Sequence, residues 1–248
     1  MPNQTGVRDT RSELPGENFV LTKSQVAYFK TFGFLKIPAL YAPEIDRIRE
    51  GFEEVFANEP SQLLDPRNPY HRARDPRYEE ETREIVPAFI DKSPKLSWLR
   101  DDPRTVAVAK GLLGDGYVYA ESDGNLFNCD VYWHLDVYGA VDRVEHIKLS
   151  FYLDELHHDT GALRVIPGSH FESTYAKELY RGIAYEPERV HDNFGISVEE
   201  IPSWTLEVTP GDLIVGNFRT MHGSFNGAAR RRLFTVNFSA AQGGATGA

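Results

Sequence analysis

The sequence predicts a mainly β protein, a sandwich or barrel built from residues 115–240 with N-terminal helices packed outside it. Short runs of alternating or β-branched residues, separated by Gly, Pro, Asp and Asn, fill the second half of the chain. The first half instead places apolar residues at helical spacing. The 248 residues are a length that single all-β domains commonly reach. We therefore expect one domain over 21–240, between a flexible arm (1–20) and a flexible tail (241–248).

Three helices are expected before residue 115, so that 22–113 is mainly helical. The first begins after Thr22, which starts a capping box, and ends at Gly33. The run FLKIPAL that follows is typical of a short strand. The second helix begins at Pro43, because proline is favoured at the first helical position. The third extends from Pro103 to the glycine that follows Leu113.

Six runs in the second half are expected to form the strands of the barrel. They are YVYAES, HIKLSFYL, ALRVI, TLEV, DLIVG and RLFTVNFS. Two long segments, 59–90 and 168–203, interrupt this organisation with prolines and charged residues. Loops of this length inside a compact domain are uncommon and are often functional lids. We expect both to close over one mouth of the barrel.

Composition excludes several classes of protein. The chain has 27 Lys and Arg against 37 Asp and Glu, a formal charge of −10, whereas nucleic-acid binding needs a concentrated basic face. No apolar run approaches the roughly 18 residues of a membrane span, and the N-terminus lacks the apolar core of a secretion signal. The single Cys129 cannot form an internal disulfide. We expect a cytoplasmic protein without nucleic-acid or membrane partners, of undetermined oligomeric state.

Three residues suggest metal chemistry. His134 and Asp136 lie at the end of a predicted strand, where side chains at i and i+2 point the same way. His222 lies between the predicted strands DLIVG and RLFTVNFS. Two His and one carboxylate on one face of a metal form the facial triad of non-haem Fe(II) oxygenases. The triplet 230–232 then supplies arginines, whose planar fork suits bidentate binding of a dicarboxylate.

Four segments follow one another in an order that points to a known family. LTKSQVAYFKTFGFLKIPAL opens the series, YWHLD carries the first metal motif, GALRVIPGSH lies in the middle, and MHGSFNGAARRRLFTVNF closes it. Together they resemble the phytanoyl-CoA dioxygenase family of Fe(II)/2-oxoglutarate oxygenases, which includes ectoine-hydroxylase-like members. The resemblance extends over most of residues 20–240. It implies a double-stranded β-helix, a cupin-like jelly roll flanked by N-terminal helices.

The resemblance also implies a reaction. His134, Asp136 and His222 are expected to bind Fe(II) as the catalytic centre, with 2-oxoglutarate chelating the metal. The family uses O2, converts 2-oxoglutarate to succinate and CO2, and hydroxylates an unactivated C–H bond of a small-molecule substrate. Asp136 favours hydroxylation over halogenation, because related halogenases have a small residue there. Desaturation or epoxidation remains an alternative, as does a non-oxygenase metal protein of the cupin type.

The expected contacts of 2-oxoglutarate are Arg231 and Asn125. Strand parity lets only one of Arg231 and Arg232 face the metal. The strand alignment favours Arg231, although the family's usual spacing from the distal histidine favours Arg232. Asn125 matches an Asn that contacts 2-oxoglutarate in ectoine-hydroxylase-like members, but it could instead form a turn. Lys148 is a rival contact.

Residues that flank the triad are candidates for substrate binding. They include Tyr132, Tyr138 and Arg219. Arg219 could meet an anionic group of the substrate or form a salt bridge at the rim. The family acts on acyl-CoA, amino acids, osmolytes and secondary metabolites, so the resemblance does not name the substrate.

Overall fold

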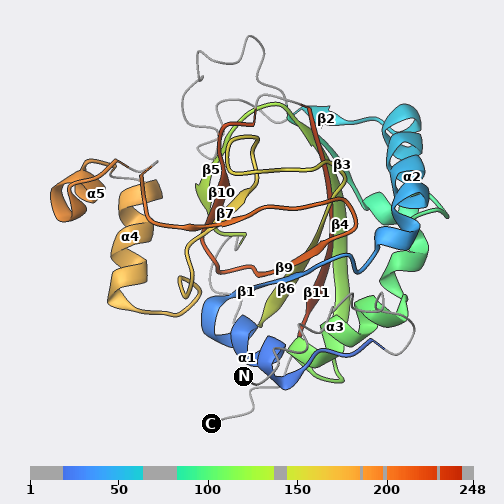
Figure 1. The fold of residues 1–248 in the computed structure, drawn as a ribbon, viewed down its shortest axis with the longest axis horizontal. Helices are drawn as coiled ribbons and strands as arrows, with labels where there is room; N and C mark the ends of the chain where they lie inside the picture. Colours follow the sequence, from blue (N-terminus) through green and yellow to red (C-terminus); the bar gives the residue numbers. More distant parts are fainter. Residues whose placement is uncertain are drawn as a thin grey trace, which may run out of the picture.

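Two antiparallel sheets form the body of the protein (Figure 1). The structure is a computed structural model and describes residues 19–63, 83–136, 144–184, 187–197, 200–227 and 230–241. The larger sheet contains, in spatial order, β1 (Phe34–Ile37), β9 (Leu213–Asn217), β6 (His146–Tyr152), β11 (Arg231–Ser239), β4 (Val118–Phe127), β3 (Arg83–Pro87) and β2 (Gln62–Leu63). The smaller sheet contains β5 (Val131–His134), β10 (His222–Ser224), β7 (Leu163–Val165) and β8 (Trp204–Leu206). The prediction of a mainly β protein is confirmed.

Helices flank both sheets. The α-helices are α1 (Lys23–Phe32), α2 (Ile45–Asn58), α3 (Pro103–Leu113), α4 (Thr174–Ala184) and α5 (Pro187–Phe194), and the 3-10 helices are η1 (Ala42–Glu44), η2 (Phe89–Lys92) and η3 (Ser97–Arg100). Thr22 forms the predicted capping box, and Gly33 ends α1 in the left-handed region at φ 83°. In Figure 1, α2 and α3 lie on the side of the larger sheet and α4 on that of the smaller. Within the described ranges, no helix has the length and apolar character that crossing a bilayer requires.

The two segments predicted as loops contain regular structure where they are described. β2 and β3 lie within 59–90 and extend the larger sheet, while residues 64–82 lie outside the described part of the chain. α4 and α5 occupy much of 168–203. The apolar residues of α4 recur every three or four positions and pack against Trp133 of β5. This helical period was overlooked because charged residues surround it.

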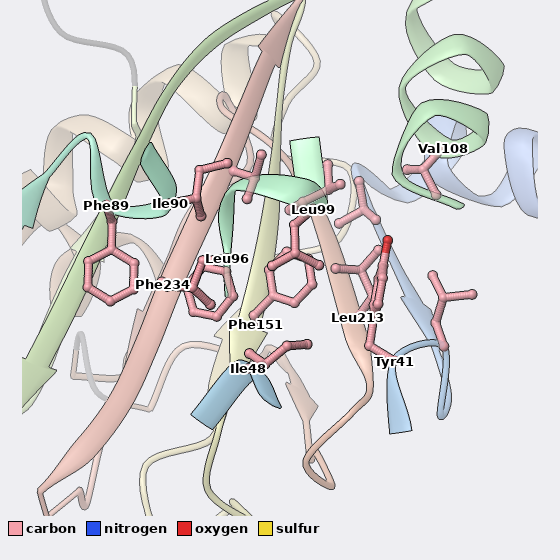
Figure 2. Close-up of a cluster of buried hydrophobic side chains, with 14 of the residues drawn as sticks. Tyr41, Ile48, Phe89, Ile90, Leu96, Leu99, Val108, Phe151, Leu213 and Phe234 are labelled. Carbon is pink, nitrogen blue, oxygen red and sulfur yellow. The ribbon is translucent and has the colours of Figure 1, made fainter. Parts of the chain in front are cut away.

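Side chains of the larger sheet alternate between two environments. On β11, Phe234 and Val236 are fully buried on the face that packs against α2, α3 and the 3-10 helices. Phe151 of β6 stacks on Phe234 with ring centroids 4.6 Å apart, at the centre of the cluster that Figure 2 shows. Leu233 and Thr235 face the opposite way, toward the smaller sheet. The helices therefore seal one face of the sheet, and the other is free to line a cavity.

We predict that Gly124→Ala destabilises the fold by about 1–3 kcal/mol, the usual cost of overpacking a core. Gly124 lies in β4, and a Cβ there would collide with the buried ring of Phe89. Gly216→Ala in β9 is the matched control, because no atom lies within 4 Å of its Cβ position. Urea unfolding would measure both, and equal effects of the two substitutions would contradict the packing explanation.

Candidate active site

A cavity of about 80 Å³ lies between the two sheets. This is several times the roughly 10–15 Å³ that one water requires. Among the described residues, its wall includes Asp123, Asn125 and Phe127 of β4, Lys148, Ser150 and Tyr152 of β6, Leu233 and Thr235 of β11, Arg83 of β3, and His134, Val165, His222 and Ser224 from the smaller sheet, together with Asp136. The inner faces of the strands therefore place ionisable groups among apolar side chains.

The structure brings His134, Asp136 and His222 together. His134 ends β5 and His222 begins β10, and the two are direct partners in the antiparallel pairing of these strands. The Nε2 atom of His134 lies 3.8 Å from Oδ1 of Asp136, and Nε2 of His222 lies 3.5 Å from its Oδ2. One potential ligand atom from each residue falls within 4.8 Å of the others. Three donors from two distant segments thus meet at one point.

Backbone carbonyls orient both imidazoles. Nδ1 of His134 donates to the carbonyl of Tyr132, and Nδ1 of His222 donates to that of Thr220, each over 2.8 Å. A carbonyl only accepts, so the proton resides on Nδ1 and each Nε2 carries a lone pair that can coordinate a metal. Burial, with the neighbouring His222, lowers the pKa of His134 to about 3. Burial also lowers the pKa of His222. Both rings are therefore neutral, as metal ligands must be.

Lys148 holds the third ligand. Its Nζ lies 2.6 Å from Oδ1 of Asp136, and the Asp136 backbone N–H donates to the carbonyl of Phe218 over 2.9 Å. Burial alone would raise the pKa of Asp136, but the Lys148 ammonium and the two imidazoles hold it below its usual range. Because Lys148 engages Oδ1, the Oδ2 atom is the one that remains for a metal. Lys148 also lines the cavity, so its expected role as a rival contact of 2-oxoglutarate stays a prediction.

Arg231 and Arg232 point to opposite faces of β11. Arg231 is 1% exposed and donates to the carbonyl of Gly161 over 2.8 Å and to Ser224 Oγ, a group of the cavity wall. Arg232 lies on the helix side, where its guanidinium pairs with Asp154 at 2.5 Å and Glu53 at 2.8 Å. Only Arg231 is therefore placed next to the cavity.

Asn125 lies inside β4, opposite Leu233, and not in a turn. It is 1% exposed, and its Oδ1 accepts from Nε and Nη2 of Arg83 over 3.1 and 3.0 Å. Its Nδ2 donates to Asp123. Arg83 was not predicted as a site residue, because residues 59–90 were expected to form a loop, although the alternation in REIVP was a usable signal of a strand.

The predicted substrate contacts are less central. Tyr132 is half-buried and packs edge-on against Phe225, with ring centroids 5.8 Å apart. Arg219 is half-buried in the turn after β9, where its backbone N–H donates to Asn217 Oδ1. Neither belongs to the described residues that line the cavity. Tyr138 lies outside the described residues, so the roles of all three stay predictions.

Comparisons with known proteins agree with this fold. Solved structures with the same fold include SnoK, a non-heme alpha ketoglutarate dependent carbocyclase from nogalamycin biosynthesis, at 19% identity and TM-score 0.67, covering 89% of this chain and 85% of that one. EctD from S. alaskensis is 23% identical with a TM-score of 0.62, and the match covers 92% of this chain and 79% of that one. HygX from Streptomyces hygroscopicus, with nickel and 2-oxoglutarate bound, is 20% identical with a TM-score of 0.63, and the match covers 90% of this chain and 89% of that one. The predicted jelly roll is confirmed.

Sequence comparison gives two further results. A search of curated proteins found no match. The model of the phytanoyl-CoA dioxygenase (PhyH) family matches residues 29–233, which span both sheets and all three metal-ligand candidates. Since this match covers most of the sequence, the chain belongs to the phytanoyl-CoA dioxygenase family.

Proposed function

We propose that the protein is an Fe(II)- and 2-oxoglutarate-dependent oxygenase that hydroxylates an unactivated C–H bond of a small-molecule substrate. The observation that carries this proposal is the convergence of His134, Asp136 and His222 at the wall of the cavity between the two sheets. Family membership supports it, as does the structure of HygX with nickel and 2-oxoglutarate.

The donor set fits a divalent metal of intermediate hardness. The two Nε2 atoms and Oδ2 of Asp136 would hold Fe(II) on one face and leave the other positions open. When bound, iron and 2-oxoglutarate supply the oxidising chemistry, with O2 consumed and succinate and CO2 released. The protein contributes orientation and exclusion of water, since His134 and Asp136 are each only 8% exposed.

Arg231 is our proposed anchor for the distal carboxylate of 2-oxoglutarate. Its buried guanidinium lies behind Ser224 and 4.3 Å from the ring of Phe127, and both of these residues line the cavity. Asn125, in the same wall, is the proposed second contact. A non-oxygenase cupin would need no cation for a dicarboxylate, so Arg231 favours the oxygenase.

We propose hydroxylation as the reaction, in preference to desaturation, epoxidation, halogenation or ring closure. SnoK is a carbocyclase, so related folds also serve other reactions. Asp136 provides a carboxylate ligand at the position where halogenation would need room for a halide. Product analysis, once a substrate is known, separates hydroxylation from desaturation, epoxidation or ring closure.

Anaerobic addition of Fe(II) and then 2-oxoglutarate is the experiment that tests the function. We expect a weak visible charge-transfer band with the wild-type protein and none with Asp136→Ala, because chelation requires the metal to be held. Under air, candidate metabolites should stimulate succinate formation. A wild-type protein without the band, at saturating metal and 2-oxoglutarate, would refute the oxygenase proposal and leave the alternative of a non-oxygenase metal protein of the cupin type.

The metal ligands can be tested without turnover. We expect His222→Ala and His134→Ala each to weaken Mn(II) binding more than about 100-fold, since loss even of an outer-shell partner costs 10–100-fold. His157→Ala is the control, because that histidine is exposed and pairs with Glu155. Calorimetric titration measures the affinities, and equal affinity in all four proteins would rule out this metal site.

Substitutions of Arg231 and Arg232 should have different effects on the binding of 2-oxoglutarate. We expect Arg231→Gln to raise the 2-oxoglutarate concentration needed for half-maximal charge-transfer absorbance at least tenfold, with Arg231→Lys intermediate because it keeps the charge but loses the fork. Arg232→Gln should leave that concentration unchanged and reduce the free energy of unfolding by about 1 kcal/mol or less, since its ion pairs are partly exposed. The reverse pattern would assign the anchor to Arg232.

A further inference from the structure

Arg83 is a cation of the cavity wall that pairs with no carboxylate among the described residues. Its Nε and Nη2 both donate to one neutral oxygen, Oδ1 of Asn125. A guanidinium carries five N–H donors in a rigid fork, so further donors remain for a ligand. Arg83 is half-buried, which makes an added hydrogen bond stronger than it would be in open solvent.

The other charges of the wall already have partners. Lys148 pairs with Asp136 at 2.6 Å. Asp123 accepts from Thr235 Oγ1 over 2.6 Å at one oxygen and from the amide of Asn125 at the other. The Asn125 amide thus separates Asp123 from Arg83. Arg83 and Asp123 balance in formal charge but make no direct ion pair, so the guanidinium N–H donors of Arg83 that Asn125 does not use remain for a ligand of the cavity.

The pairing of strands β3, β4 and β11 separates Arg83 from Arg231, the proposed anchor of 2-oxoglutarate. Phe127 of β4 pairs directly with Arg83 of β3 on one side and with Arg231 of β11 on the other. The guanidinium carbons lie 5.9 and 4.3 Å from the centroid of its ring. Phe127 thus stands between two cations, which favours two separate anion positions. Arg83 is also close enough to the triad for its charge to help lower the pKa of His222.

We propose that Arg83 forms an oxyanion subsite beside the metal triad and that the substrate is an anionic small molecule, whose carboxylate or phosphate group binds there. This inference rests on the proposed oxygenase function. An Arg fork matches both groups bidentately. Binding the anion at Arg83 would fix the distance of the substrate from the metal and so decide which carbon reacts.

Small probes test the subsite with the protein loaded with zinc(II) and 2-oxoglutarate. Acetate, methyl phosphate and the neutral acetamide each carry a methyl group that saturation-transfer NMR detects. We expect acetate or methyl phosphate to bind the wild type and Arg83→Gln to weaken that binding at least tenfold. Arg83→Lys should recover part of it. Arg100→Gln, which removes an equal charge at an ion pair with Asp91, should have no effect. The tighter of the two anions indicates the substrate class.

Three results would overturn the subsite. They are no preference of the wild type for either anion over acetamide, unchanged anion binding in Arg83→Gln, or a tenfold loss of 2-oxoglutarate affinity in Arg83→Gln, which would make Arg83 a co-substrate residue. The anaerobic charge-transfer band, recorded on the same variants with Fe(II), keeps the two proposals distinct. If the wild type lacks the band, the proposed oxygenase function is refuted. If the band is normal but the wild type binds acetate and methyl phosphate no better than acetamide, only the proposed subsite is refuted.

Discussion

A β-strand can turn only every second side chain toward the cavity, and this constraint organises the whole molecule. In β11, Phe234 and Val236 join the core under the helices, while Leu233 and Thr235 face the smaller sheet. Burying each large apolar side chain contributes about 1.5–3 kcal/mol. The helix-side core therefore supplies the stability of the sheet. The opposite face of the same strands is released to carry charged and polar groups that a core could not accommodate.

The polar face is costly, and its geometry shows how the cost is limited. A buried carboxylate loses its hydration, and the Lys148 ammonium, 2.6 Å from Asp136, offsets part of that loss. The imidazoles avoid the problem because they stay neutral. Their Nδ1 hydrogen bonds to the carbonyls of Tyr132 and Thr220 fix the rings before any metal arrives. The site is thus preorganised by backbone atoms, which no side-chain substitution removes directly.

What the sequence could predict depended on how local each feature is. The capping box at Thr22 and the shared direction of His134 and Asp136 follow from spacing within one segment. The position of His222 between two predicted strands made it a candidate ligand, and the family resemblance strengthened that prediction, although β10 itself has only three residues and no readable period. The contact of Lys148 with Asp136 depends on how two sheets pack, which a single sequence does not specify. Arg83 was not predicted as a site residue, because its place beside the cavity depends on the pairing of β3 with β4, which the sequence alone does not show.

Two glycines explain how distant motifs meet at Arg231. A Cβ at Gly161 would lie 2.5 Å from Nη1 of Arg231, and one at Gly227 would collide with the same guanidinium. Gly161 also adopts φ 90°, which other residues rarely reach. The segments GALRV and SFNG can therefore close around the arginine only because both positions lack a side chain. This close approach holds Arg231 against Ser224 of β10, the strand that also carries His222. The packing of these segments therefore links the positions that we propose for the metal and for the co-substrate.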